Sequence, residues 1–210
     1  MKIIVITPQS SKEEEIKIII QLFENGLKTL HLRKPKFRTK ELKDYLKQIP
    51  PQFHDRIVIH SHHLLALKYN LKGIHFTKTH LKKNFRNWWV KKILVLSKAN
   101  LVKTTSHTKL ASLYDTTKMN FDYIFLSPIF DSLTGKYQSG FYEEGIRTTL
   151  IKTGKNVIAR GGVDGTRLPK INDLGFNGLA LYSYIWESKT PIENFLKLLK
   201  QCDELNISIE

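Results

Sequence analysis

The feature that most constrains the fold is a regular alternation between short apolar runs and longer segments with helical periodicity. The runs are about four residues long and mostly hydrophobic, which is typical of parallel strands buried on both faces. They span residues 3–6, 29–32, 56–59, 73–76, 93–96, 123–126, 157–159 and 178–181.

The segments between the runs place apolar residues on one helical face. We expect helices over residues 12–25, 39–48 and 190–205. Gly26 is expected to end the first, Thr39 to cap the second, and Pro191 to lie in the first turn of the third. The residues expected to face inward are Ile16, Ile19, Ile20 and Phe23, then Leu42, Tyr45, Leu46 and Ile49, then Ile192, Phe195, Leu196 and Leu199.

Eight strands that alternate with helices predict a single (β/α)₈ (TIM) barrel over residues 1–210. A doubly wound parallel sheet is the alternative, because alternation does not reveal whether a sheet closes. No linker or change of composition divides the chain, so we expect one domain.

The overall composition favours an ordinary globular protein, with 41% hydrophobic and 25% charged residues. No apolar run approaches the roughly 18 residues of a membrane helix, and the first residues lack the pattern of a secretory signal. The one cysteine, Cys202, cannot form an internal disulfide and is expected to be a packing residue. We therefore expect a cytoplasmic protein that does not contact a membrane.

The chain carries a formal charge of +15, from 34 Lys and Arg against 19 Asp and Glu. Such a charge is common in proteins that bind nucleic acids. However, the basic residues recur along the whole chain among acidic ones, which favours a solvated surface, and we expect no nucleic-acid partner. A basic mouth that attracts small phosphorylated ligands is the middle possibility.

Polar residues follow the predicted strands, where a barrel carries its chemistry. Gly161-Gly162 and Tyr182-Ser183 follow the seventh and eighth strands, a position where barrels often bind phosphate on backbone N–H groups. Arg33 and Lys34 follow the second strand and could bind a diphosphate, although a solvated strand end explains them equally well. The strand-end residues are Arg33-Lys34, His60-Ser61-His62-His63, Thr77-Lys78, Thr105-Ser106-His107, Ser127-Pro128, Arg160-Gly161-Gly162 and Tyr182-Ser183.

Histidines crowd one of these loops, where His60, His62 and His63 are followed by His75 and His80. Their spacing matches neither the H-x-x-x-H pattern of a helical metal site nor a Cys/His zinc pattern. We therefore favour structural or substrate-contacting histidines over a metal site. His107 is expected to head a helix.

Taken in order, the strand-end segments resemble the thiamine phosphate synthase family, which includes the thiazole tautomerases. Residues 31–36, 57–62 and 73–80 resemble the family motifs Q-L-R-x-K, I-I-I-N-D-R and G-V-H-L-G-Q-x-D. Residues 105–108 are similar to S-x-H-T, residues 122–123 to D-Y, and residues 127–136 to G-P-I-F-x-T-x-T-K. Residues 161–163 and 175–185 match G-G-I and G-A-D-G-V-A-V-V-S-A-I, so the resemblance covers about residues 4–185.

The resemblance implies a transferase that joins hydroxymethylpyrimidine diphosphate to thiazole phosphate and releases diphosphate. It implies small phosphorylated substrates and leaves a homodimer open. Cations must stabilise the leaving group, and the second phosphate would lie on Gly162 and Ser183. The residues at catalytic positions are Arg33, Lys34, Lys136 and Thr105, and those at substrate-binding positions are His31, Lys36, His60, His107, Ser127, Gly161, Gly162, Tyr182 and Ser183.

The sequence also departs from the family pattern. The family's Mg²⁺ carboxylates fall at Ser61 and His80, so Mg²⁺ is implied by the resemblance but is expected to bind weakly or not at all. Lys34 is expected to replace part of the ion's charge. A thiazole tautomerase needs no such ion and could use His60, His62 or His107 as a base, but it depends on a histidine where this chain has Ser127-Pro128. A silent phosphate-binding barrel is the remaining alternative.

Overall fold

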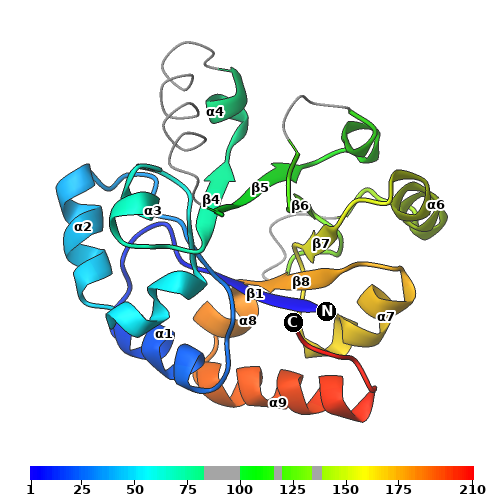
Figure 1. The fold of residues 1–210 in the computed structure, drawn as a ribbon. Helices are drawn as coiled ribbons and strands as arrows, with labels where there is room; N and C mark the ends of the chain where they lie inside the picture. Colours follow the sequence, from blue (N-terminus) through cyan, green and yellow to red (C-terminus); the bar gives the residue numbers. More distant parts are fainter. Residues whose placement is uncertain (83–99, 116–119, 134–138) are drawn as a thin grey trace.

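The computed structural model describes residues 1–82, 100–115, 120–133 and 139–210. Within these residues, eight parallel strands close into a barrel in the order of the chain (Figure 1). Strand β1 pairs with β8 from Lys2↔Gly178 to Val5↔Leu181, which confirms the predicted barrel and excludes an open, doubly wound sheet. The strands are β1 Lys2–Ile6, β2 Leu30–Leu32, β3 Ile57–Ile59, β4 Gly73–Phe76, β5 Val102–His107, β6 Tyr123–Leu126, β7 Val157–Arg160 and β8 Gly178–Leu181.

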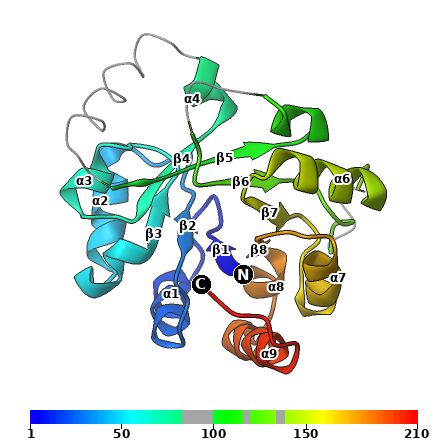
Figure 2. The same ribbon diagram turned by 45° about the vertical axis from the view of Figure 1, so that its right-hand side comes forward.

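Helices surround the strands on the outside of the barrel (Figure 2). They are α1 Glu15–Glu24, α2 Thr39–Lys47, α3 Leu65–Lys68, α4 Lys78–Lys82, α6 Glu143–Thr153, α7 Leu168–Asp173, α8 Ser183–Trp186 and α9 Pro191–Glu204. Short 3₁₀ helices cover Pro51–Arg56 (η1), Leu110–Leu113 (η2) and Gly165–Arg167 (η3). None of the helices in the described part of the chain has the length and apolar character needed to cross a bilayer.

Two details of the predicted helices are wrong. Thr39 is the first residue of α2 rather than its cap, because the N-cap is Arg38, whose backbone N–H donates to Glu41 at 2.7 Å. In α9 the buried residues are Phe195, Leu198 and Cys202, whereas Leu196 is 44% exposed. The prediction is therefore wrong for Leu196 and missed Leu198, whereas Phe195 and Cys202 are buried as expected.

The fifth strand of the barrel differs from the prediction. The predicted run at residues 93–96 lies outside the described residues, and the barrel uses Val102–His107 instead. This strand is mostly polar, so hydrophobicity did not reveal it; its pairing with β4 and β6 defines it. His107 is consequently the last residue of β5, not the head of a helix, and η2 begins only at Leu110.

Side chains alternate between the barrel interior and the layer under the helices. Leu30 and Leu32 pack outward against the helices, so His31 between them points inward. The apolar interior cluster is formed by Ile4, Ile6, Tyr123, Phe125, Ile158 and Ala180. The interior is therefore apolar beside β1 and β6–β8, and it carries buried His31, His75 and Thr104 on the side of β2–β5.

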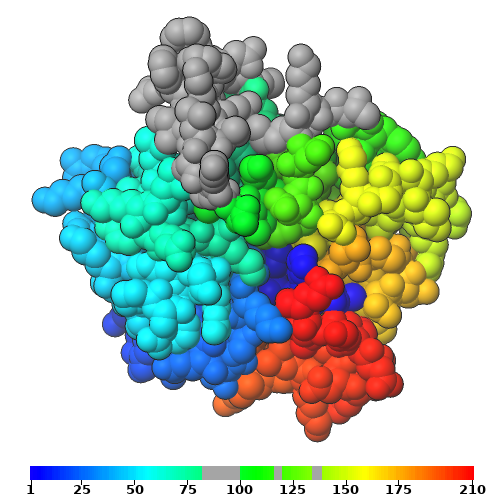
Figure 3. All heavy atoms as spheres, in the orientation of Figure 1, coloured from blue at the N-terminus to red at the C-terminus, as the bar shows by residue number. Residues whose placement is uncertain are grey.

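The C-terminal segment lies over the beginning of β1, where the last residues meet the first (Figure 3). The backbone N–H of Glu210 donates to the carbonyl of Met1 at 3.1 Å. This contact joins the two ends of the chain at the amino-terminal end of the barrel, whereas barrels carry their chemistry at the opposite end.

Candidate functional site

A cavity of about 380 Å³ opens at the carboxyl ends of the strands. Its walls come from loops after β1, β2, β6, β7 and β8, which a closed parallel barrel brings to one rim. The lining residues are Ile6, Gln9, Arg33, Ser132, Leu133, Arg160, Gly161, Gly162, Val163, Ala180, Tyr182, Ser183 and Glu187. Of the residues expected in a site, Arg33, Gly161, Gly162, Tyr182 and Ser183 meet here.

The Gly161-Gly162 turn has a backbone that only glycine fits. Its φ angles are +92° and +64°, and a Cβ at Gly162 would lie 2.1 Å from the carbonyl oxygen of Asp131. The chain after β6 packs directly on the turn, because Phe130 N–H donates to the Gly161 carbonyl at 3.1 Å. Glycine is therefore required because the segment after β6 packs where the side chains would lie, and the turn itself lines the cavity.

Two arginines contribute positive charge to the cavity wall. Arg33 follows β2, and its backbone N–H donates to the buried Thr7 hydroxyl at 2.9 Å, which fixes the strand end. Arg160 is the last residue of β7, and its guanidinium lies 3.5 Å from the Ser106 hydroxyl. Arg160 is one of the strand-end residues in the sequence analysis, but it is not among the predicted site residues. Its position as the one charged residue of an apolar strand was the available signal.

Lys34 does not line the cavity, contrary to expectation. Its ammonium group is fully buried, 2.7 Å from Glu15 Oε1 and 3.0 Å from the Ser10 carbonyl oxygen. Tyr45 donates its hydroxyl proton to the same carboxylate. Burial lowers the pKa of Lys34, and the Glu15 carboxylate opposes that shift. The charge of Lys34 is thus used inside the protein, where it ties the loops after β1 and β2 together.

His31, His60 and His75 form a buried cluster inside the barrel, on the side of β2–β4. His31 Nδ1 lies 2.9 Å from His60 Nε2, and the His60 and His75 rings stack with centroids 4.1 Å apart. Three hydroxyls surround the cluster: Tyr123 is 2.6 Å from His31 Nε2, Thr104 is 2.8 Å from His75 Nδ1, and Ser106 is 3.1 Å from His75 Nε2.

The three imidazoles are neutral at neutral pH. Burial, followed by the positive charge of Arg160, lowers the pKa of His75 to about 3. Burial also places the pKa of His31 and of His60 well below the ordinary value, with neighbouring His75 as the second cause. In the neutral form, each ring has one N–H donor and one lone pair.

The remaining expected residues lie outside the cavity lining. The Thr105 hydroxyl donates to the carbonyl of Phe76 at 2.9 Å within the sheet, and His107 ends the same strand half-buried. Lys36 is exposed in the loop after β2. His62 contacts the same loop, because its Nε2 lies 2.8 Å from the Phe37 carbonyl oxygen. Ser127 lies beside Gly161 at the end of β6. Lys136 lies outside the described residues.

The residues at the implied magnesium positions do not suit that ion. The Ser61 hydroxyl oxygen is buried without a hydrogen-bond partner. His80 Nδ1 accepts a hydrogen bond from the Thr77 N–H at 3.2 Å. Neither side chain is a carboxylate, and Mg²⁺ prefers hard oxygen ligands with negative charge.

The comparisons with known proteins agree with the resemblance in the sequence. The family model described as thiamine monophosphate synthase matches residues 3–185. Thiamine-phosphate synthase from Methanobrevibacter smithii is 22% identical, and the alignment covers 95% of this chain and 96% of that protein. The structure of thiamine phosphate pyrophosphorylase from Bacteroides thetaiotaomicron superimposes with a TM-score of 0.76 at 31% identity, covering 97% and 98% of the two chains. The enzyme of that name from Pyrococcus furiosus gives the same TM-score at 19% identity, covering 97% and 96%.

Proposed function

The chain belongs to the thiamine monophosphate synthase family, and on that basis we propose that it joins hydroxymethylpyrimidine diphosphate to thiazole phosphate. The observation that carries this proposal is one cavity with two arginines on its wall and a Gly-Gly backbone turn on its rim. Two phosphorylated substrates need both features, a cationic wall for a diphosphate and exposed amides for a phosphate.

In the proposed reaction, the bond between the pyrimidine methylene carbon and the diphosphate oxygen breaks, and the diphosphate leaves with the electron pair. The thiazole nitrogen then supplies an electron pair to the methylene carbon, and the new C–N bond forms. Negative charge develops on the leaving group. Arg33 and Arg160 would stabilise that charge, because a guanidinium can donate two parallel hydrogen bonds to phosphate oxygens.

The thiazole phosphate would bind at the rim formed by Gly161, Gly162 and Ser183. Open backbone N–H groups in a turn with positive φ angles form a concave site for an anion. Ser183 is the first residue of α8, so its hydroxyl and nearby amides lie on the same wall. This arrangement would bring the thiazole beside the diphosphate held by the arginines.

The isomerase alternative is not favoured. The relatives described above are named as synthases or pyrophosphorylases. Of the bases considered for a tautomerase, His62 contacts Phe37 and Thr39 at the start of α2. His60 and His107 are not among the cavity-lining residues. A base must reach the proton that it removes.

Members of the family generally depend on Mg²⁺. For this chain we propose turnover that does not require the ion, with Arg33 and Arg160 supplying the positive charge. The absence of carboxylates at Ser61 and His80 supports this proposal. Lys34, expected from the sequence to replace part of the ion's charge, is instead paired with Glu15.

The test is incubation of the purified chain with both phosphorylated precursors, with Mg²⁺ or with a chelator, followed by quantification of thiamine phosphate. We expect product in both conditions. Arg33→Gln and Arg160→Gln should each lower kcat/KM by roughly 10²–10³-fold, the usual effect of removing one group that stabilises developing charge. Arg147→Gln is the matched control, because Arg147 pairs with Asp173 outside the cavity.

No product under either condition would refute the synthase proposal. Product that requires Mg²⁺ would leave the reaction intact and refute the role of the arginines as a replacement for the ion.

A further inference from the structure

We propose that His31, His60 and His75 form a binding site for a divalent transition-metal ion of the Zn²⁺ or Co²⁺ type inside the barrel. Each ring offers one ligand nitrogen, and these three nitrogens all lie within 4.8 Å of one another. His31 and His60 stand at substrate-binding positions of the family pattern, but the proposed transfer reaction uses none of the three rings to make or break a bond. The metal proposal concerns binding alone and does not rest on the proposed function.

The strand register brings the three rings together. His31 lies at the centre of β2, His60 directly follows β3, and His75 lies in β4, so three successive strands contribute one ring each. The backbone N–H of His60 donates to the carbonyl of Leu32 at 3.1 Å, so the pairing of β2 and β3 continues up to this histidine. Neighbouring strands are about 4.8 Å apart in a sheet, a spacing that allows rings on successive strands to coordinate one metal ion.

In two of the three rings, the second nitrogen has the partner that a metal-binding histidine needs. Such a histidine usually donates its second N–H to an oxygen, which fixes the ring and its tautomer. His31 Nε2 is 2.6 Å from the Tyr123 hydroxyl, and His75 Nδ1 is 2.8 Å from the Thr104 hydroxyl. With protons on these outward nitrogens, His31 Nδ1 and His75 Nε2 keep their lone pairs for an ion.

Only small movements are needed to form a coordination sphere. Zn–N bonds of about 2.0–2.1 Å in a tetrahedron place the nitrogens roughly 3.3 Å apart. His31 Nδ1 and His60 Nε2, at 2.9 Å, would separate slightly, and the widest pair would approach by about 1.5 Å or less, as judged from the bond lengths. The Ser106 hydroxyl, now 3.1 Å from His75 Nε2, would rotate away or approach the fourth position.

The chemistry of the ligand set selects the ion. Within the described residues, the group contains three imidazoles and no carboxylate. Imidazole nitrogen suits Zn²⁺, Co²⁺, Ni²⁺ and Cu²⁺, whereas Mg²⁺ and Ca²⁺ take oxygen ligands. The residues Ser61 and His80 therefore do not suit Mg²⁺, whereas the three histidines offer nitrogen ligands inside the barrel.

The charge around the cluster predicts that an anion assists the ion. Arg160 contacts Ser106, which itself contacts His75, and Arg33 follows His31 by two residues. These two arginines repel a divalent cation, and the group contains no carboxylate that would reduce this repulsion. An anion in the cavity, held by the arginines, would offset it. Sulfate, an anion that complexes these ions only weakly in solution, should therefore raise the affinity for the metal.

The test is a titration of the full chain, freed of metal by a chelator that is then removed, with Co²⁺ and with Zn²⁺ in the presence and absence of sulfate. We expect one ion per chain, a Co²⁺ visible spectrum of tetrahedral nitrogen coordination, and tighter binding with sulfate. Mg²⁺ in large excess should not displace the ion. His31→Gln and His60→Asn should each weaken binding at least about 30-fold, because one of three protein ligands is lost.

Those two variants restore the letters of the family motifs and keep a hydrogen-bonding amide, so they should fold; circular dichroism of the metal-free proteins checks this. His62→Gln, a histidine outside the cluster, is the matched control and should bind as the wild type does. Binding that is absent from the wild type, or that persists unchanged in His31→Gln and His60→Asn, would overturn the proposal. Loss of binding in His62→Gln alone would place the metal elsewhere and also overturn it.

Discussion

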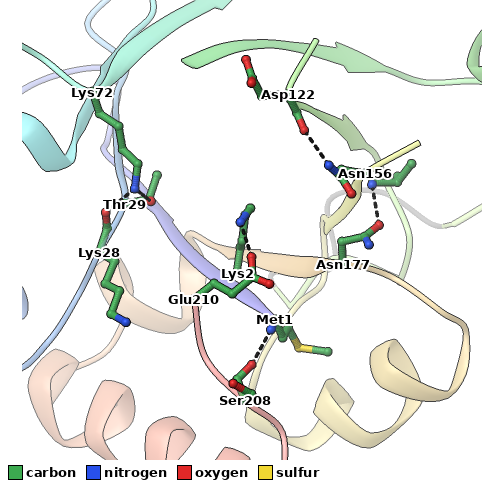
Figure 4. A network of polar contacts seen from close by, with 11 residues as sticks. Met1, Lys2, Lys28, Thr29, Lys72, Asp122, Asn156, Asn177, Ser208 and Glu210 are labelled. Carbon is green, nitrogen blue, oxygen red and sulfur yellow. Dashed lines mark hydrogen bonds and ion pairs between the residues drawn. The ribbon is translucent and has the colours of Figure 1, made fainter. Parts of the chain in front are cut away.

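The two ends of this barrel use the same polar residue types for opposite purposes. At the amino-terminal end, charged and amide groups are paired within the protein, as Figure 4 shows for Lys2 with Glu210 and Asn156 with Asp122. At the carboxyl end, Arg33 and Arg160 line a cavity of about 380 Å³. The comparison teaches that polar groups at the amino-terminal end pair with one another and stabilise the fold. At the carboxyl end, the two arginines face a cavity that can hold a ligand.

Lysines at the two ends differ in a second way, which is how deeply they are buried. At the amino-terminal end, Lys72 donates to the Lys28 carbonyl at 2.8 Å and to the Thr29 hydroxyl at 2.6 Å, and it remains partly exposed (Figure 4). At the carboxyl end, Lys34 is completely buried against Glu15. A buried charge depends on its partner far more than an exposed one does, so the first prediction compares the two ends.

The largest effect is expected from Lys34→Met. The substitution leaves the buried Glu15 carboxylate without its cation, and we expect a loss of about 3–5 kcal/mol in the free energy of unfolding. Urea denaturation measures the loss. The double variant Glu15→Gln/Lys34→Met removes both charges and should recover much of it. A free energy of unfolding of Lys34→Met within about 1 kcal/mol of the wild-type value would contradict this account of Lys34.

A second, smaller effect should appear on acidification. Burial, followed by the positive charge of neighbouring His80, lowers the pKa of His63 in the folded chain to about 4. Between about pH 6.5 and pH 4 the unfolded chain binds a proton at His63 and the folded chain does not, so stability falls as the pH falls. The loss should be roughly 1.4 kcal/mol per pH unit from this side chain.

Urea denaturation of the metal-free protein at several pH values measures the slope, and His63→Gln should reduce it by about one proton. An unchanged slope in that variant would mean that the acid sensitivity arises at other groups. In either case the comparison of slopes does not depend on how much the substitution itself destabilises the fold.

The smallest effect is expected at the amino-terminal end. Lys2→Gln removes the ion pair with Glu210, whose side chain is 66% exposed, and exposed pairs contribute about 0–1 kcal/mol. Thermal unfolding at low and high salt measures it, and the difference from the wild type should shrink as salt increases. A loss comparable to that of Lys34→Met would remove the contrast between the two ends.

Much of the architecture was determined by the sequence alone. Seven of the eight strands follow from short apolar runs, because parallel strands with both faces buried require continuous hydrophobic residues. The cavity residues Arg33, Gly161, Gly162, Tyr182 and Ser183 follow from their position after strands, because every carboxyl end of a parallel barrel meets at one rim. The family resemblance rests on these same segments.

The tertiary structure decided what periodicity and spacing do not contain. Strand β5 is polar and is defined by its pairing with β4 and β6. Lys34 has its charge neutralised by Glu15, a partner 19 residues earlier in the chain, so adjacency to Arg33 did not reveal its role. His31 and His60 are 29 residues apart and have no motif spacing, yet neighbouring strands place their ring nitrogens 2.9 Å apart. Side-chain partners depend on how strands pair in space, and a linear pattern records only each residue's own position along its strand.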